Sequence, residues 1–298
     1  MIAWIITRRA WSEFSDDNCR RMAAALAYYA AFSLPSILLI VLFLIGLVFG
    51  RAAVEGQLQR QIGSALGVRA AFMVQEMVRS AAEHANGGMI ANILGTTGLL
   101  YAATNVFAEL QSIMNRAWKV RPAESGLKRL ALKRFSSFLL IVGVALLVLI
   151  SLGAATAVTG LSGVVGISCP GWLMDALEIA FSWLLFMLLF GLLFKALPDA
   201  KIEWADVKIG AMVTSALFIM GKFLIAFYLS HSTVASPFGA AGALALLLLW
   251  AYYSAIIFLF GAELTHVWAQ EHGRVIQPKR GATLVNKGDL PRRAIVAD

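Results

Sequence analysis

The chain has 298 residues, of which 60% are hydrophobic and only 14% are charged, and its mean hydropathy is +0.77. A soluble domain of this length could not bury so much apolar side chain around one core, so these values exclude an ordinary soluble protein. The net charge of +8 would suggest a nucleic acid partner in a soluble protein, but here the cations gather in separate loops, which favours a membrane surface.

Long apolar runs recur along the whole chain, and each can cross a hydrocarbon core about 30 Å thick because a helix rises about 1.5 Å per residue. The sequence therefore predicts an all-α integral membrane protein with six transmembrane helices and short amphipathic interfacial helices. The predicted spans are residues 23–49, 89–111, 136–158, 174–196, 209–229 and 240–267. The chain divides into a cytoplasmic amphipathic lead, a six-span membrane domain and a flexible cytoplasmic tail, at residues 1–22, 23–268 and 269–298.

The lead before the first span has the pattern of a short amphipathic helix. Trp4 and Phe14 fall on one helical arc, and Arg9 and Asp16 fall on the other. We expect this helix to lie in the membrane interface, with a simple cytoplasmic lead-in as the alternative. Apolar residues also recur every three or four positions within residues 54–81, which predicts two short helices on the outer face.

The distribution of Lys and Arg predicts the orientation. Most of the 25 cations precede the first span, separate spans two and three, flank the connection between spans four and five, or lie in the tail. The positive-inside rule then places both termini in the cytoplasm. The loop of residues 116–134 carries seven of these cations and is expected to attract anionic lipid headgroups at about 1 kcal/mol per residue.

Polar residues inside spans are costly in hydrocarbon, so they mark candidate functional positions. Asn105, Glu109, Ser112 and Arg116 are spaced by four, three and four residues and share one stripe on the cytoplasmic half of the second span. This stripe is expected to face either a water-filled cavity or neighbouring helices near the interface. Both interpretations are open at this point.

Further ionisable residues lie in the later spans. Lys222 lies about three residues, or roughly 5 Å, from the middle of the fifth span. A buried ammonium needs a partner, and Glu178, near the outer entry of the fourth span, is the best placed by depth. A functional role and structural pairing are equally open. Glu263 and His266, near the inner end of the sixth span, form a weaker case because both can reach the interface.

Several short motifs occur in a fixed order along the chain. They are ALAYYAAFSLP at 25–35, NVFAELQ at 105–111, NRAW at 115–118, LPD at 197–199, FGAAG at 238–242, LWAYYS at 249–254 and GAE at 261–263. Together they resemble the YihY/virulence factor BrkB family of bacterial inner-membrane proteins, over about residues 20–270. The resemblance implies a six-span plasma-membrane protein without an established activity, with some relatives linked to envelope integrity or proposed as lipid exporters. The family has no agreed catalytic residues, so the resemblance assigns none.

The family's older label, ribonuclease BN, does not suit these residues. A metal-dependent ribonuclease needs several His and Asp ligands that converge on metal ions. The four histidines form no ligand pair on a helix, and the predicted topology divides them between the two sides. The sequence therefore predicts no enzyme, no catalytic residue, no cofactor, no metal site and no nucleic acid partner.

The function that the sequence favours is transport or flipping of a lipid or another amphiphile, linked to envelope integrity. The stripe on the second span, the mid-membrane Lys222 and the basic cytoplasmic loops motivate this prediction. A structural or scaffold membrane protein is the alternative, in which the polar residues only lock helices together. Membrane lipids are the expected partners, and the sequence sets no oligomeric state.

Overall fold

The computed structural model describes residues 2–49, 89–122, 142–143, 171–231, 239–274, 277–279 and 282–284. The helices of this part are α1 (Ile2–Asp16), α2 (Cys19–Phe49), α5 (Met89–Ala117), α7 (Gly171–Ala196), α8 (Trp204–His231) and α9 (Gly239–Glu271). Four short strands accompany them: β1 (Val120–Pro122), β2 (Ala200–Lys201), β3 (Gln277–Pro278) and β4 (Ala282–Leu284).

The helices end where the chain changes backbone conformation. Asn18 has a φ of 55° and lies in the turn between α1 and α2, and Gly273 has a φ of 70° just after α9. Asn and Gly are the residues that adopt this left-handed conformation most readily. Lys119, with a φ of 51°, also adopts it, directly after α5. This turn directs the chain from α5 into β1.

Three described helices are long and apolar enough to cross a membrane, over Ile179–Ala196, Trp204–Ile225 and Leu244–Glu271. They coincide with the predicted spans four, five and six and confirm a helical membrane protein. Helices α2 and α5 cover the predicted spans at 23–49 and 89–111. Except for residues 142–143, the predicted span at 136–158 lies outside the described residues, as do the predicted helices within 54–81, so six spans stays a prediction.

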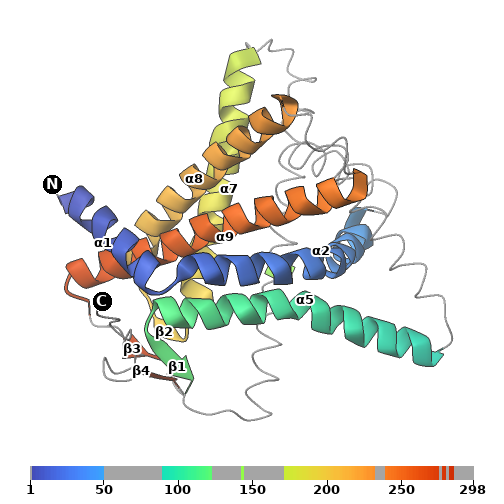
Figure 1. The fold of residues 1–298 in the computed structure, drawn as a ribbon, viewed down its shortest axis with the longest axis horizontal. Coiled ribbons are helices and arrows are strands. Elements are labelled where there is room, and N and C mark those ends of the chain that lie inside the picture. The colour runs from blue at the N-terminus through green and yellow to red at the C-terminus, as the bar shows by residue number, and fades with distance from the viewer. Residues whose placement is uncertain are drawn as a thin grey trace, which may run out of the picture.

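The long helices meet at one end of the molecule and diverge from it. Figure 1 shows α7 and α8 running away from this end in a different direction from α2, α5 and α9. The meeting end contains α1, the start of α2, and residues 113–122, 193–207 and 258–274, and we call it the converged end. The starts of α2 and α8 and the last turns of α5, α7 and α9 therefore lie together.

The core of the described part is largest at the converged end. Its fully buried large side chains include Phe14 of α1, Met114 of α5, Trp118, Phe194 of α7 and Leu259 of α9. These residues come from segments that are far apart in the sequence. Their packing fixes the helix ends relative to one another.

Helix α1 is an amphipathic helix, but it packs on protein along one side. Ile6 and Ala10 are buried against Leu264 and Val267 of α9. Trp4 is 73% exposed, although the sequence places it on the same apolar arc as the buried Phe14. The buried stripe is narrower than the predicted arc because α1 packs mainly on one helix, α9.

Part of the predicted tail, which begins at residue 269, has regular structure among the described residues. Helix α9 continues to Glu271, β3 pairs with β2, and β4 pairs with β1, both antiparallel. The predicted fold class also contained no strand. Strands of two or three residues are too short to produce an alternating apolar pattern, so the sequence carries no signal for them.

Candidate functional site

A group of polar side chains lies inside the converged end, where α1, α2, α5 and α9 meet. We call it the polar cluster, and it consists of Glu13, Asp17, Cys19, Lys119, Glu263 and His266. Glu13 and Asp17 are four residues apart and therefore project from the same side of α1 and the turn after it. Glu263 and His266 are three residues apart on one face of α9.

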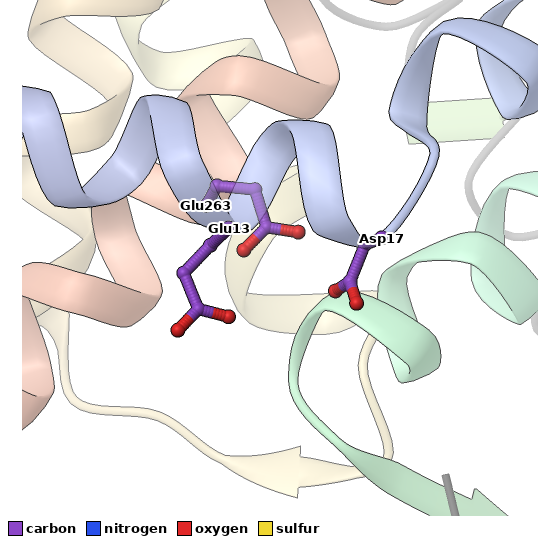
Figure 2. A group of neighbouring side chains, drawn as sticks. All are labelled: Glu13, Asp17 and Glu263. Atoms are coloured by element: carbon purple, nitrogen blue, oxygen red, sulfur yellow. The ribbon is translucent and has the colours of Figure 1, made fainter. Parts of the chain in front are cut away.

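Three carboxyl groups of the polar cluster face one another. One oxygen from each of Glu13, Asp17 and Glu263 lies within 4.8 Å of the other two. Figure 2 shows the carboxyl group of Glu263 between those of Glu13 and Asp17. The side chain of Glu263 is fully buried, whereas those of Glu13 and Asp17 are 29% and 13% exposed.

Lys119 is the cation of the polar cluster. Its Nζ forms an ion pair with Asp17 and lies 3.5 Å from Oε2 of Glu13. Burial alone would lower the pKa of this ammonium, but its hydrogen bond to Asp17 and the charges of the nearby carboxylates outweigh burial and raise the pKa above its ordinary value. Lys119 is therefore charged, and it balances one of the three carboxylates.

Glu263 and His266 form the driest part of the polar cluster, at 0% and 1% exposure. The thiol of Cys19 donates to Oε1 of Glu263 at 3.8 Å, and Gln270 Nε2 contacts His266 Nε2 at 2.8 Å. Oε2 of Glu263 lies 3.9 Å from Nδ1 of His266, which is beyond hydrogen-bond distance. The sequence indicated that both side chains can reach the interface; in the structure both are buried in the protein, where His266 packs against Trp118.

Three buried polar atoms in this region have no hydrogen-bond partner among the described residues: Glu263 Oε2, His266 Nδ1 and Trp118 Nε1. The rings of Trp118 and His266 are 5.4 Å apart. An unsatisfied buried polar group costs about 1–3 kcal/mol, so such atoms usually have a partner in the working protein.

A second polar network joins α5 to the connection between α7 and α8. Asn115 Nδ2 donates to Asp199 Oδ2 at 2.8 Å, and the backbone N–H of Asp199 donates to Asn115 Oδ1 at 2.7 Å. Gln111 Nε2 adds a longer bond of 3.4 Å to the same carboxylate. The backbone N–H of Lys279 donates to the carbonyl of Asp199 at 2.8 Å, so the network also holds part of the tail.

Ion pairs at the surface hold the remaining helix ends. Arg9 of α1 pairs with Glu271 at the end of α9. Arg274 pairs with Glu203, and its Nε lies 3.0 Å from Oδ1 of Asp206 at the start of α8. The polar groups of the converged end therefore link α1, α5, α8 and α9 directly.

Helices α8 and α9 approach each other closely through small residues. A Cβ added at Gly210 would lie 1.7 Å from Thr265 Oγ1 and 2.9 Å from the backbone oxygen of Gly261. A Cβ at Gly261 would lie 1.8 Å from Thr214 Oγ1. Small residues let the two backbones approach closely. Close van der Waals packing of this kind drives helix association in lipid, where the hydrophobic effect between helices is absent.

The predicted stripe on the second span does not form one site with the polar cluster. Asn105 and Glu109 are half-buried, and Ser112 and Arg116 are exposed. The polar face of α5 that packs inward carries Gln111 and Asn115 instead. Whether the predicted stripe faces a water-filled cavity or neighbouring helices stays a prediction.

The predicted pair of Lys222 and Glu178 stays a prediction as well. Lys222 is half-buried on α8, and it forms no ion pair within the described part of the chain. Glu178 belongs to α7, but its side chain lies outside the described residues. Of the residues that the sequence singled out, Glu263 and His266 belong to the polar cluster. Sequence reasoning missed Glu13, Asp17 and Lys119, whose spacing is also typical of a solvated surface.

The chain is similar over most of its length to known membrane proteins. Residues 10–283 match the profile of the protein family described as Virulence factor BrkB. UPF0761 membrane proteins from Alcanivorax borkumensis, Azotobacter vinelandii and Coxiella burnetii are 26%, 27% and 28% identical over 273, 265 and 262 residues. These alignments cover 89%, 86% and 87% of this chain but 61%, 61% and 91% of the relatives, so the chain spans about three fifths of the first two. No solved structure matches the chain.

Proposed function

Because the chain belongs to the BrkB virulence factor family of membrane proteins, we propose that it transports or flips a lipid or another amphiphile across the bacterial inner membrane and thereby supports envelope integrity. Both termini, and with them the converged end, lie in the cytoplasm in this proposal. The cations of the described converged end, such as Arg9, Lys119 and Arg274, support that orientation.

The surroundings of Lys222 carry the proposal. This residue is half-buried in the apolar span Trp204–Ile225, and the next two residues, Phe223 and Leu224, are 53% and 57% exposed. An ammonium within a bilayer costs about 2.5–3.5 kcal/mol on the insertion scale unless water or an anion accompanies it. A cation beside exposed apolar side chains suits a molecule with an anionic headgroup and acyl chains.

Lipid transfer by the purified protein tests this proposal. The full chain is reconstituted into vesicles that contain a trace of fluorescent phosphatidylglycerol, and dithionite is added to destroy the fluorophore in the outer leaflet. Vesicles without protein should lose about half of the signal, because only that leaflet is accessible, and vesicles with the protein should lose nearly all of it. Signal loss equal to that of protein-free vesicles would contradict the proposal.

Variants of Lys222 make the test specific. We expect Lys222→Met to abolish transfer and Lys222→Arg to keep most of it, because arginine retains the charge. Lys208→Met removes an exposed lysine from the first turns of the same helix and serves as the matched control. Equal transfer by the Lys222→Met and Lys208→Met variants would remove Lys222 from the mechanism.

The scaffold alternative rests on a different observation. Ion pairs and hydrogen bonds join the helix ends at the converged end, and the glycine contacts hold α8 against α9. Such locking is what a structural protein requires. A scaffold would show no lipid transfer at all, and Lys222→Met would change at most its thermal stability.

A further inference from the structure

The charges of the polar cluster do not balance. Glu13, Asp17 and Glu263 carry three negative charges when ionised, and Lys119 supplies one positive charge. His266 is neutral unless it takes up a further proton. When all three carboxyl groups are ionised, two negative charges are left over in a largely buried volume, where an uncompensated charge is costly.

The positions of the carboxylate oxygens match those of ligands around one ion. Because these oxygens lie within 4.8 Å of one another, a single ion placed between them can be shared by all three carboxylates. Ca²⁺ accepts oxygen ligands in flexible geometry at about 2.3–2.6 Å, whereas Mg²⁺ demands near-ideal octahedral geometry at about 2.0–2.1 Å, so an irregular set of three side chains suits Ca²⁺ better. Oxygen ligands without sulfur are the set that hard divalent cations prefer.

A second observation points to a ligand at this place. Oε2 of Glu263 has no hydrogen-bond donor within the described residues although its side chain is fully buried. Figure 2 shows that this carboxyl group is directed into the space between Glu13 and Asp17. A cation there would bind a buried carboxylate of which one oxygen has no hydrogen-bond partner among the described residues.

His266 is suited to support such a site from outside. If the amide of Gln270 donates to Nε2, the neutral ring carries its proton on Nδ1, and Nδ1 is then a donor located 3.9 Å from Oε2 of Glu263. At this distance the two atoms form no hydrogen bond, but carboxylates that bind metals usually accept one from a neighbouring group, and His266 is placed to supply it if the gap closes. The partial exposure of Glu13 and Asp17 leaves the ion a way in.

We propose that Glu13, Asp17 and Glu263 bind one hard divalent cation, of the Ca²⁺, Mn²⁺ and Mg²⁺ class, beside the Lys119 ammonium at the converged end. The ion links α1 and the turn after it to α9, and it brings the charge of the polar cluster to zero. The site departs from our expectation of no metal, and it does not depend on the proposed lipid transport. Either proposal can fail while the other holds.

Direct binding of Mn²⁺ tests the site, because free Mn²⁺ is visible by electron paramagnetic resonance and bound Mn²⁺ is not under the same conditions. The full chain is purified in detergent, stripped with EDTA and titrated with Mn²⁺. We expect one Mn²⁺ bound per chain, displaced more readily by Ca²⁺ than by Mg²⁺. Mn²⁺ or Ca²⁺ at about 100 times the dissociation constant should also raise Tm by about 4 °C or more. No binding above the level of detergent alone would overturn the proposal.

Substitutions assign the binding to these residues. Glu263→Gln and Asp17→Asn preserve shape and should each weaken Mn²⁺ binding at least tenfold. Glu271→Gln is the matched control, because it removes an exposed carboxylate of the same helix that pairs with Arg9 outside the polar cluster. Equal weakening in all three variants would mean that Mn²⁺ binds non-specifically, and the proposal would be wrong.

Lys119 separates the proposed site from an ordinary ion-pair network. If the carboxylates hold a metal, Lys119→Met should tighten Mn²⁺ binding, because three carboxylates then face the ion without a competing ammonium. The Tm of this variant should be low in EDTA and recover with Mn²⁺. If Lys119 is instead the only cation that the carboxylates accept, the Lys119→Met variant should lose stability and Mn²⁺ should not restore it. That result would overturn the proposal. It can be obtained even if Glu263→Gln and Asp17→Asn fail to fold.

Discussion

The converged end buries polar side chains, whereas the diverging parts of α7 and α8 expose apolar ones. At the converged end, Glu263 and His266 are fully buried and carry polar contacts. Along the diverging parts, Leu188 of α7 and Phe227 of α8 are 50% and 66% exposed. Exposed apolar side chains suit a hydrocarbon environment, whereas buried charges need partners in the protein. The difference indicates that the converged end holds the fold together and that the diverging parts face lipid.

The largest effect should come from truncating the core of the converged end. Phe194→Ala removes a fully buried ring that packs against Phe190 and Phe258, and we expect a loss of about 3–5 kcal/mol. Phe227→Ala, on the exposed part of α8, should cost less than about 1 kcal/mol in detergent. Reversible unfolding in mixed micelles measures both. Similar losses for the two variants would remove the distinction between the regions.

A smaller loss is expected where α8 and α9 touch. Gly210→Ala forces a methyl group against Thr265 and the backbone of Gly261, which should destabilise the protein by about 1–3 kcal/mol. Gly98→Ala is the matched control on α5, because nothing lies within 4 Å of the added carbon. The control should leave stability unchanged or raise it slightly, since alanine favours helix more than glycine does. A stable Gly210→Ala variant would show that the two helices can separate without cost.

Substitutions in the hydrogen-bond network at Asp199 should cause the next largest loss of stability. Asn115→Ala removes the two short hydrogen bonds between Asn115 and Asp199, one of which is to the Asp199 carboxylate. We expect this to lower the free energy of unfolding by about 1–2 kcal/mol. Gln111→Ala removes only the contact of 3.4 Å and should cost less. Thermal unfolding of the two variants side by side gives the order. The reverse order would mean that the longer contact, and not the reciprocal pair, joins α5 to the loop before α8.

The smallest effect should follow loss of a surface ion pair. Arg9→Ala breaks the contact with Glu271, whose side chain is 36% exposed, and exposed pairs contribute about 0–1 kcal/mol. The same unfolding measurement at low and high salt should show little difference. A loss above 2 kcal/mol would indicate that charge, and not the burial of Ile6, Ala10 and Phe14, fixes α1 on α9.

The sequence predicted the long helices because their apolar runs exceed what a soluble core can contain. It also predicted the amphipathic character of α1 from the spacing of its apolar residues. Neither feature depends on which helices are neighbours. The pairing of β3 and β4 with strands near α5 and α8 does depend on neighbours, and strands of two or three residues leave no periodic pattern.

The candidate site was harder to predict for the same reason. Glu13, Asp17, Lys119 and Glu263 come from three segments far apart in the sequence, and an acidic pair four residues apart resembles a solvated face. Glu263 was recognised, together with His266, because an ionisable side chain in an apolar run is costly wherever it points. On α5, a step of one residue turns the helix by about 100°, so the sequence could not distinguish the stripe ending at Arg116 from the inward face at Asn115.

We propose that all of the described helix ends of the converged end lie on one side of the membrane, in the cytoplasm. Single cysteines at Arg121, Glu203 and Thr283, three exposed positions on different segments of this end, test it directly in a chain with Cys169→Ser. Cys19 stays in place because it is buried. A membrane-impermeant maleimide should label all three in inverted vesicles and none in intact cells. Labelling of any one of them in intact cells would contradict the account.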